Sequence, residues 1–422
     1  MAARRTLEEW LTFQLQLHPQ HIDLGLERVR IVADRLALLP PTARTAIVGG
    51  TNGKGSTATF LAELAQAHGN RVGLFTSPHL LSYQERLRVE GVEVEEAALC
   101  EAFEQIEAAR GHESLTFFEF NALAALWVFR AAAADINVLE VGLGGRLDAT
   151  NVVDADVAVL CSVGMDHRDW LGDTLEAIGT EKAGIFRVGQ AVVLGAGPMP
   201  DSVEAALLRL HCHVRRAVVD FRWAVHSGGR WDFFQGDTTL LQLPPPALPG
   251  AIQYQNAACA LMAFIEVYGL QKLDAAAIGR AMHAVSLPGR LQIVPGAVEW
   301  IFDVAHNEPA AAVLAAELRT RPRRGVTRAV FGMLADKDVA AVAAQLDPLV
   351  DHWLLSSLDA PRALTAAQLC AQMGSLRGTF ELCASVTEAT ARAASQAQAG
   401  DRILVCGSFH TVGPALQARG LY

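Results

Sequence analysis

The sequence predicts an α/β fold with two domains, each built on a mostly parallel sheet covered by helices. Apolar runs of strand length alternate with helical patterns from about residue 45 to the end of the 422-residue chain. This alternation is typical of parallel sheets whose crossover connections are helices. The length favours more than one core, and 51% hydrophobic against 19% charged residues provide ample apolar surface to bury.

The first domain has the clearer alternation of elements. Its strands are expected at 45–49, 72–76, 138–141, 157–163 and 191–194. Its helices are expected at 54–68, 95–110, 118–133, 174–186 and 201–211. Short alternating segments with glycine turns over 223–243 predict a small antiparallel insertion, which Pro244-Pro245-Pro246 closes as a stiff connector.

A second, smaller domain is expected after a break at Leu287-Pro288-Gly289-Arg290. Two helices precede that break, at 256–268 and 275–285. The alternation then restarts, with strands expected at 300–304, 329–332, 352–356 and 403–407. We therefore predict domains over 1–288 and 289–422, the second one Rossmann-like.

Charge and cysteine content exclude several classes of protein. A formal net charge of −10 argues against a nucleic-acid or membrane-surface binder, which needs a basic face. Seven cysteines without a CxxC pair suggest neither a disulfide framework nor a zinc ribbon. Neither the start of the chain nor any later stretch has the pattern of a secretory signal or a membrane span. We expect a cytoplasmic protein with no nucleic-acid or membrane partner.

The strongest motif is the glycine-rich segment Gly49-Gly50-Thr51-Asn52-Gly53-Lys54-Gly55-Ser56, between an expected strand and an expected helix. Glycines let backbone N–H groups converge on phosphate, Lys54 neutralises charge, and Ser56 is placed to reach a magnesium ion. The usual spacing would put glycine at Val48 and Ser or Thr at Gly55. A glycine-rich turn with a surface lysine is the alternative. A P-loop ATPase-like nucleotide site is the better hypothesis.

Three polar residues should emerge at one edge of the sheet, where such folds bind ligands: Glu140 at the end of an expected strand, and Ser77 and His167 after two others. A capping or ion-paired acid is the alternative for Glu140. A structural histidine is the alternative for His167.

Several motifs together resemble the Mur ligase superfamily and, within it, the folylpolyglutamate synthase/dihydrofolate synthase branch. The resemblance covers nearly the whole chain, because its motifs occur in the right order. Besides the glycine-rich segment, they are Thr76-Ser77-Pro78-His79-Leu80, the block from Leu139 to Asn151, Asp166-His167, Glu181-Lys182-Ala183-Gly184-Ile185-Phe186, Phe302-Asp303-Val304-Ala305-His306-Asn307 and Cys406-Gly407-Ser408-Phe409-His410.

The resemblance implies a role for each residue in these motifs. Two magnesium ions would be held by Ser77, Glu140 and His167 together with Ser56. Lys182 would be carbamylated, and the oxygens of the carbamate would also approach the metal. A solvated lysine is the alternative for Lys182. ATP would bind to Asn52, Gly53, Lys54, Gly55, Ser56, Asn256, Arg290 and Asp303. His306 would position phosphate or the incoming glutamate. An ordinary linker arginine is the alternative for Arg290.

The pterin-bearing substrate is expected on three segments that resemble those of the bifunctional bacterial enzymes. They contain Ile22, Asp23, Leu24 and Gly25, then Phe117, Phe118, Glu119 and Phe120, then Leu147, Asp148 and Ala149. Aromatic rings would stack on the flat pterin and benzoate groups, and an acid would accept pterin N–H groups. The alternative is that the three phenylalanines belong to the hydrophobic core at the start of a helix.

The resemblance implies an ATP-dependent ligase that adds L-glutamate to dihydropteroate and to reduced folates through an acyl phosphate. The same resemblance implies a monomer. A cell-wall ligase of the same superfamily would need an N-terminal domain for which 50 residues leave no room. A non-ligating nucleotide-binding module remains the alternative from another class, and an inactive homologue is disfavoured by the intact glycine-rich segment.

Overall fold

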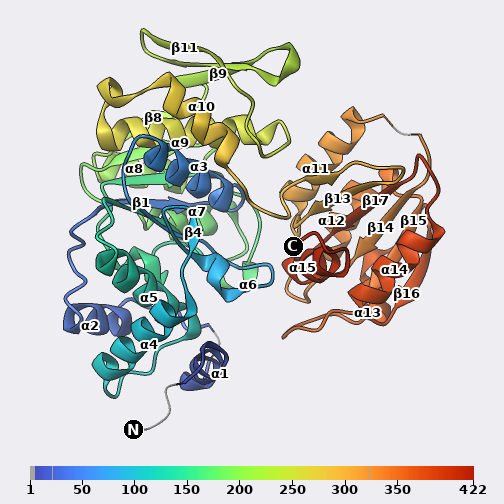
Figure 1. Ribbon diagram of the computed structural model, residues 1–422, viewed down its shortest axis with the longest axis horizontal. Helices are drawn as coiled ribbons and strands as arrows, with labels where there is room; N and C mark the ends of the chain where they lie inside the picture. The colour runs from blue at the N-terminus through green and yellow to red at the C-terminus, as the bar shows by residue number, and fades with distance from the viewer. Residues whose placement is uncertain (1–4, 21, 323) are drawn as a thin grey trace. The chain divides into compact units, whose positions relative to one another are not determined.

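A computed structural model describes residues 5–20, 22–322 and 324–422 (Figure 1). Residues 1–4, part of the start compared above with a signal peptide, lie outside the described residues. The chain divides into two compact units. The first contains 1–163, 174–247 and 254–285, and the second contains 164–173, 248–253 and 286–422. The predicted boundary after residue 288 stays a prediction, and two short earlier stretches belong to the second unit.

The first unit is built on an eight-stranded sheet of order β4-β3-β2-β5-β1-β6-β7-β8. All neighbouring strands run parallel except β3, which is antiparallel to β2 and to β4. The strands are β1 (Arg44–Gly49), β2 (Val72–Phe75), β3 (Leu87–Val89), β4 (Val92–Glu93), β5 (Ile136–Glu140), β6 (Val157–Leu160), β7 (Ala191–Leu194) and β8 (His213–Arg216). Buried aliphatic runs in β1, β5 and β6 explain why these strands were predictable, since a parallel sheet is covered on both faces.

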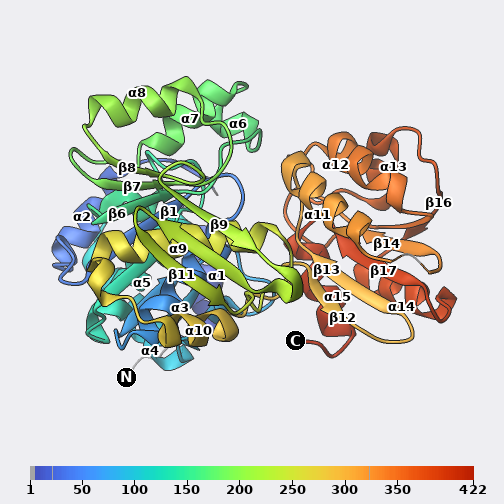
Figure 2. The ribbon, with the colours of Figure 1, turned by 90° about the horizontal axis from the view of Figure 1, so that it is seen from above.

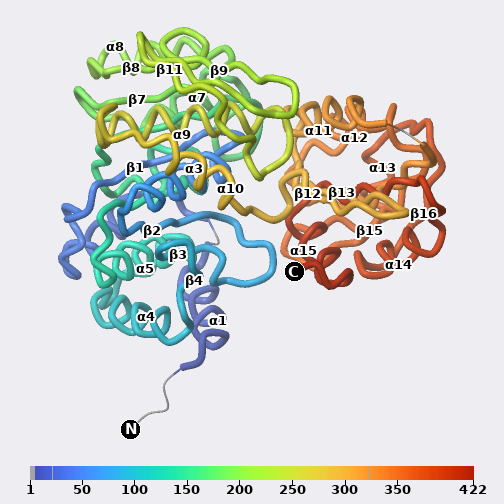
Figure 3. The backbone as a smooth tube through the Cα atoms, turned by 45° about the horizontal axis from the view of Figure 1, so that its top comes forward, coloured from blue at the N-terminus to red at the C-terminus, as the bar shows by residue number. Residues whose placement is uncertain are grey.

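Helices cover both faces of this sheet. They are α1 (Leu7–Leu17), α2 (Glu27–Arg35), α3 (Lys54–Ala67), α4 (Glu96–Arg110), α5 (Phe117–Ala131), α7 (Leu175–Ala183), α8 (Asp201–Arg209), α9 (Ile252–Tyr268) and α10 (Ala275–Ala284), with short 3₁₀ turns at Tyr83–Arg86, Ala149–Val152, Ser227–Gly229 and Leu270–Lys272. Figure 2 shows α7 and α8 on one side of the strands and α3, α9 and α10 on the other. The helix α1 packs on α4 and α5 (Figure 3).

The predicted antiparallel insertion is present as a three-stranded sheet. Its strands are β9 (Phe221–Val225), β10 (Trp231–Gln235) and β11 (Thr238–Leu243), in the order β11-β10-β9. Trp231 and Phe233, on its central strand, are fully buried. The first strand starts at Phe221, two residues before the predicted segment.

The second unit contains a six-stranded sheet of order β12-β13-β17-β14-β15-β16, parallel except for β12. Its elements are α6 (Arg168–Leu171), β12 (Gln292–Val294), β13 (Glu299–Asp303), α11 (Glu308–Thr320), β14 (Thr327–Phe331), α12 (Val339–Leu346), a 3₁₀ turn at Asp347–Leu349, β15 (His352–Ser356), α13 (Ala366–Met373), β16 (Thr379–Cys383), α14 (Val386–Gln396), β17 (Arg402–Cys406) and α15 (Phe409–Ala418). The two-domain α/β fold class is confirmed. The strand that Asp303 ends is preceded by β12, which the sequence did not predict.

None of the helices within the described part of the chain is long and apolar enough to cross a membrane.

Candidate active site

The glycine-rich segment connects β1 to α3 and leaves the start of that helix open to an anion. Gly53 is the N-cap residue, at φ 88°, and no side chain caps the first turn. The N–H groups at a helix start attract phosphate through their hydrogen-bonding capacity and the helix dipole. Ser162 is hydrogen-bonded to the segment twice: its carbonyl accepts from Thr51 N at 2.8 Å, and its hydroxyl accepts from Asn52 N at 3.0 Å. Ser162 was not predicted.

Two lysines converge on this segment. The Lys54 ammonium donates to the carbonyls of Gly50, at 3.0 Å, and Thr51, at 3.1 Å. The Lys182 ammonium, from the last turn of α7, donates to the same Gly50 carbonyl at 2.9 Å. Lys182 is 5% exposed, so the solvated surface lysine considered as its alternative is excluded.

Asn256 lies directly on the glycine-rich segment. A Cβ atom added to Gly53 would lie 2.9 Å from Asn256 Oδ1. The side chain comes from α9, about two hundred residues later in the chain, and is buried. The structure therefore brings together the predicted nucleotide-binding residues of the first unit.

Glu140 ends β5 and faces the start of α3. Its carboxylate accepts from Ser77 N at 2.8 Å, and a Cβ atom added to Gly55 would lie 3.4 Å from Glu140 Oε1. An added Cβ at position 55 would therefore be in van der Waals contact with this carboxylate. Ser56, next in the chain, is buried. Glu140 thus lies next to Ser77 and beside the start of α3, the helix that contains Ser56.

The loop after Glu140 packs against the helix that carries Lys182. Arg146 N donates to the carbonyl of Glu181 at 2.8 Å, and the Arg146 guanidinium pairs with the Glu181 carboxylate at 2.8 Å. A Cβ atom on Gly145 would lie 2.9 Å from the carbonyls of Glu181 and Lys182. The close approach of this loop to the backbone of Lys182 therefore requires glycine at position 145.

Arg28 joins two of the segments predicted to bind the substrate. Its guanidinium donates to Asp23 Oδ2 at 2.7 Å and to Glu119 Oε1 at 3.2 Å. Ile22, Asp23, Leu24 and Gly25 are all partly buried. Glu119 also closes the capping box at the start of α5 with Thr116. Arg28 was not among the predicted site residues.

The phenylalanines of α5 separate into two groups. Phe117 and Phe118 are partly exposed, and Phe118 lies against Gly142, where an added Cβ would be 2.5 Å from the ring. Phe120 is fully buried, with its ring centroid 5.6 Å from that of Phe103. Phe120 therefore belongs to the core, which was its alternative, whereas Phe117 and Phe118 are partly exposed and pack at the edge of the same core.

Asp148 uses its carboxylate to shape the third predicted segment. It accepts from Leu143 N at 2.9 Å and from Thr150 N at 3.0 Å, and it caps the 3₁₀ turn that contains Ala149. Burial raises the pKa of Asp148, against the lowering effect of these hydrogen bonds. Leu147, next to it, is partly exposed.

In the second unit, four polar residues surround Asp166. Lys337 Nζ donates to Asp166 Oδ1 at 2.6 Å, Asn307 Nδ2 donates to Asp166 Oδ2 at 2.9 Å, and His306 Nε2 lies 3.8 Å from that oxygen. His167 Nε2 lies 3.3 Å from Lys337 Nζ. His167, predicted together with Ser77 and Glu140, thus belongs to a cluster of the second unit.

The charges of this cluster shift two pKa values. Burial opposes ionisation of Asp166, but the positive charges of His167, Lys337 and His306 outweigh it and hold the pKa well below its usual range. Burial, assisted by the charge of Lys337, lowers the pKa of His306 to about 4. His306 is therefore neutral at pH 7, with Nδ1 2.8 Å from the Val304 carbonyl. Lys337, in a short polar turn after β14, was not predicted.

Arg290 and Asp303 also lie in the second unit. Asp303 accepts from Leu291 N and from Ala305 N, each at 2.8 Å, and burial raises its pKa. The Arg290 guanidinium lies 5.1 Å from the centre of the Phe409 ring. Asp303 thus fixes the backbone next to Arg290, through Leu291.

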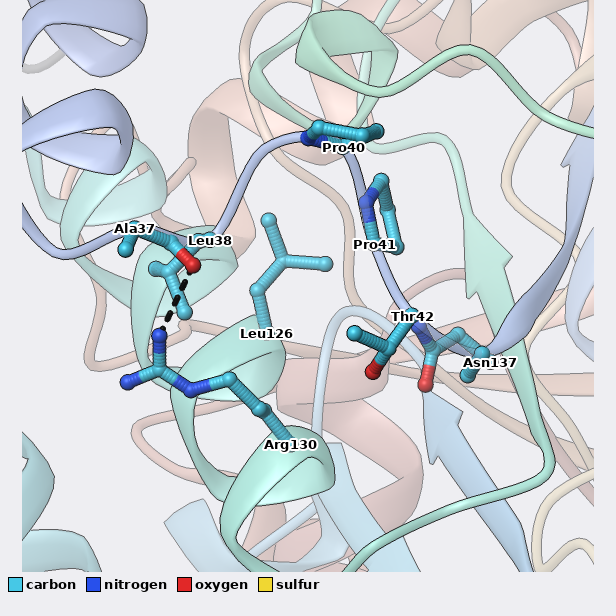
Figure 4. Close-up of a pocket in the computed structure, with 9 residues that line it drawn as sticks. Ala37, Leu38, Pro40, Pro41, Thr42, Leu126, Arg130 and Asn137 are labelled. Atoms are coloured by element: carbon cyan, nitrogen blue, oxygen red, sulfur yellow. Dashed lines mark hydrogen bonds between the residues drawn. The ribbon is translucent and has the colours of Figure 1, made fainter.

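A separate pocket lies at the other end of the strands, near the start of β1 and β5 (Figure 4). It is lined by Ala37, Leu38, Pro40, Pro41, Thr42, Ala43, Leu126, Arg130 and Asn137. Arg130 donates to the carbonyls of Leu36 and Ala37 there, which closes the pocket on one side. None of the predicted site residues lines this pocket.

Sequence families match both units. Residues 48–196 match the Mur ligase middle domain, and residues 289–409 match the Mur ligase glutamate ligase domain. The first range contains the glycine-rich segment, Glu140 and Lys182, and the second contains Arg290, Asp303 and His306. The fold and the site therefore define a ligase of the Mur type.

The chain belongs to the dihydrofolate synthase/folylpolyglutamate synthase family. It is 44% identical to the Escherichia coli dihydrofolate synthase/folylpolyglutamate synthase, over 98% of this chain and 96% of that one. It is 30% identical to the Mycobacterium tuberculosis protein of the same name, over 93% and 90%. E. coli FolC in complex with DHPP and ADP matches at 44% identity with a TM-score of 0.93, over 99% of this chain and 98% of that one. The Yersinia pestis bifunctional enzyme complexed with AMPPNP and Mn ion matches at 44% identity with a TM-score of 0.91, over 99% and 98%.

Proposed function

We propose that this chain is an ATP-dependent ligase that joins L-glutamate to dihydropteroate and to reduced folates, and that it releases ADP and phosphate. The observation that carries the proposal is the arrangement around Gly50 to Ser56. Lys182, Asn256 and Glu140 meet this segment from three different elements, and Lys54 lies within it. Relatives with bound ADP, AMPPNP, Mn and L-glutamate support the same chemistry.

The polyphosphate of ATP is proposed to lie on the start of α3. Backbone N–H groups from Gly53 to Ser56 donate to its oxygens, Asn52 lies beside them, and Lys54 neutralises part of its charge. Asn256, in contact with Gly53, binds the nucleotide from the side of α9. Arg290 and Asp303 are proposed to contribute to nucleotide binding from the second unit.

Magnesium is proposed to be held by Ser56, Ser77 and Glu140, with His167 and Lys182 as further ligands. Two hydroxyls and a carboxylate are the hard oxygen donors that magnesium prefers, and Glu140 is fixed by the Ser77 N–H. Within the described residues, no group of three or more His, Cys, Asp or Glu could hold a metal ion by itself. ATP oxygens must therefore complete the coordination. When bound, the cation neutralises charge between the phosphate oxygens.

Lys182 is proposed to be carbamylated. Its buried nitrogen donates to Gly50, and a carbamate nitrogen keeps one N–H with which to preserve that bond. The added carboxylate reverses the charge of the side chain and gives the metal site a further anionic ligand. Incubation with ¹³C-bicarbonate should give a carbamate signal that Lys182→Arg lacks; an unlabelled wild-type protein would contradict this assignment.

The flat end of the substrate is proposed to lie on Phe117 and Phe118. The segment with Ile22, Asp23, Leu24 and Gly25 forms a second wall, which Arg28 ties to Glu119. Leu147, Asp148 and Ala149 form the third. These surfaces suit a ring system with N–H donors at one end and a carboxylate at the other.

The reaction then has two steps. A carboxylate oxygen of the substrate attacks the γ-phosphorus, the new O–P bond forms, and the bond to the leaving oxygen of ADP breaks. The glutamate amine next attacks the acyl carbon, phosphate leaves with the bonding electrons, and the amine loses a proton. The protein positions these groups and screens their negative charges, as is usual in phosphoryl transfer. His306, neutral and next to Asp166, is proposed to position phosphate or glutamate.

We infer a cytoplasmic monomer whose partners are small molecules, without nucleic acid or membrane. The net charge of −10 and the seven free cysteines support this setting.

Purified protein with ATP and L-glutamate tests the proposed function directly. ADP should be released when dihydropteroate is added and, in a separate reaction, when tetrahydrofolate is added, and each product should gain the mass of one glutamyl residue. ADP release that needs neither glutamate nor a pterin substrate would contradict ligation.

A further inference from the structure

Arg86 is a buried cation that no acidic side chain neutralises at close range. It ends the 3₁₀ turn Tyr83–Arg86 and is 8% exposed. Its Nε donates to Nδ1 of His79, a neutral acceptor, at 2.7 Å, and its guanidinium carbon lies 5.5 Å from the centre of the Phe117 ring. Among the described residues, no carboxylate lies within 4.0 Å of it, although most partly buried arginines of the chain have one.

Burial of this charge destabilises the folded protein in the absence of a ligand. Burial lowers the pKa of Arg86, whereas the more distant charges of Tyr83, Glu85 and Glu140 raise it. The Glu85 carboxylate is already used by the N–H groups of Leu80, Leu81 and Ser82. A guanidinium has five N–H donors, and only the Nε donor has a partner among the described residues. A buried charge normally has a counter-charge, and here that counter-charge is missing.

The position of Arg86 indicates what the counter-charge is. On one side is Phe117, which belongs to the surface proposed for the flat end of the substrate. The main chain of Arg86 adjoins the phosphate end of the site: Thr76 N donates to the Arg86 carbonyl at 2.9 Å, and the next residue, Ser77, donates through its N–H to Glu140. A substrate that extends from the aromatic surface toward the phosphates must pass its carboxylate between these two ends.

We propose that Arg86 binds the substrate carboxylate that becomes phosphorylated, as a bidentate partner through its two Nη groups. This inference rests on the proposed function. The planar fork matches both oxygens of a carboxylate, so it fixes the orientation of the acid as well as its position. His79 and the Phe117 ring hold the guanidinium so that little side-chain freedom is lost when the substrate binds. Arg86 stays protonated throughout.

A comparison of two ligands on matched variants tests this role. Dihydropteroate and its primary carboxamide differ only at the proposed contact, so the ratio of their dissociation constants reports on it. The wild-type protein should bind the acid roughly ten- to a hundredfold more tightly than the amide, because hydrogen bonds to charged groups contribute that much. Arg86→Gln should lose this preference, and Arg86→Lys should keep part of it.

Arg88→Gln is the matched control, because Arg88 lies two residues further on and pairs with Glu93 at 3.5 Å. It should keep the full preference for the acid. ADP binding and the thermal unfolding of each variant verify that the fold is intact. If Arg86→Gln still prefers the acid as strongly as wild type, Arg86 is only structural and the inference is wrong. A wild-type protein that binds neither ligand would instead contradict the proposed function itself.

Discussion

Lys54 and Lys182 donate to the same carbonyl oxygen, that of Gly50, at 3.0 and 2.9 Å. Two ammonium groups that share one acceptor repel each other, and here they come from two different helices, α3 and α7. A polyphosphate on the start of α3 would relieve this repulsion. Carbamylation of Lys182 would relieve it as well, because the pair would then carry opposite charges.

Removal of the Lys54 charge should abolish most of the activity. We expect Lys54→Ala to lower kcat by at least about a hundredfold, since one electrostatic contact to transferring charge contributes about 3 kcal/mol. Glutamate-dependent ADP release measures the effect. Lys272→Ala, at an exposed position, should retain wild-type turnover. Equal rates for the two variants would contradict the role of Lys54.

We expect nucleotide binding to require the conformation of Gly53. Gly53→Ala places a Cβ atom 2.9 Å from Asn256 Oδ1 at a φ of 88°, so both the strain and the contact disturb the segment. Gly69→Ala is a matched control, because Gly69 has a φ of 86° but nothing within 4 Å of an added Cβ. Both variants should lose about 1 kcal/mol of stability from the strained backbone. Only Gly53→Ala should also weaken ADP binding, measured by calorimetry.

The ion pair between Lys337 and Asp166 should contribute to the stability of the second unit. Lys337→Met leaves the Asp166 carboxylate, 8% exposed, without its nearest cation, and we expect a loss of about 3 kcal/mol in urea unfolding. Asp166→Asn combined with Lys337→Met should cost less than the sum of the single changes. Additive losses would show that the two side chains do not interact.

The pKa of His306 predicts how stability depends on pH. The unfolded chain protonates this imidazole near pH 6.5, whereas the folded chain does so only near 4. As the pH falls from about 6.5 to 4, the unfolded state gains a proton first, so the free energy of unfolding decreases. The depressed pKa of Asp166 causes a further loss at lower pH, below its usual range of titration. The free energy of unfolding is therefore expected to decrease in two separate pH intervals, an upper one due to His306 and a lower one due to Asp166.

Replacement of His306 isolates the upper interval. His306→Gln should remove about 2 kcal/mol of the change in unfolding free energy between pH 6.5 and 4, measured with urea at several pH values. His283→Gln, at an exposed site, should leave the pH profile as in wild type. A profile unchanged by His306→Gln would mean that His306 is not held neutral.

The sequence was informative where local patterns determine structure. β1, β5 and β7 were predicted to within two residues, because buried aliphatic runs leave few alternatives. The end of β6 was placed at Val163, but the strand stops at Leu160. The reason is that Ser162 bonds to Thr51 and Asn52 of the phosphate-binding segment rather than to a neighbouring strand.

Contacts between segments that are distant in the chain could not be predicted from the sequence. Arg86 lies in a short turn without any helical or strand periodicity, and its burial depends on Phe117, thirty-one residues later. Lys337 pairs with Asp166 across 171 residues, which no local pattern encodes. These side chains are long and charged, so sequence alone favours solvent for them. Only the tertiary structure identifies them as buried.

Transfer of oxygen from the substrate to phosphate tests the acyl phosphate most directly. With dihydropteroate labelled with ¹⁸O in its carboxylate, each turnover with ATP and L-glutamate should deliver one labelled oxygen to inorganic phosphate. The other labelled oxygen should remain in the amide product. Label found in AMP, or phosphate free of label while the glutamyl product forms, would contradict activation by the γ-phosphoryl group.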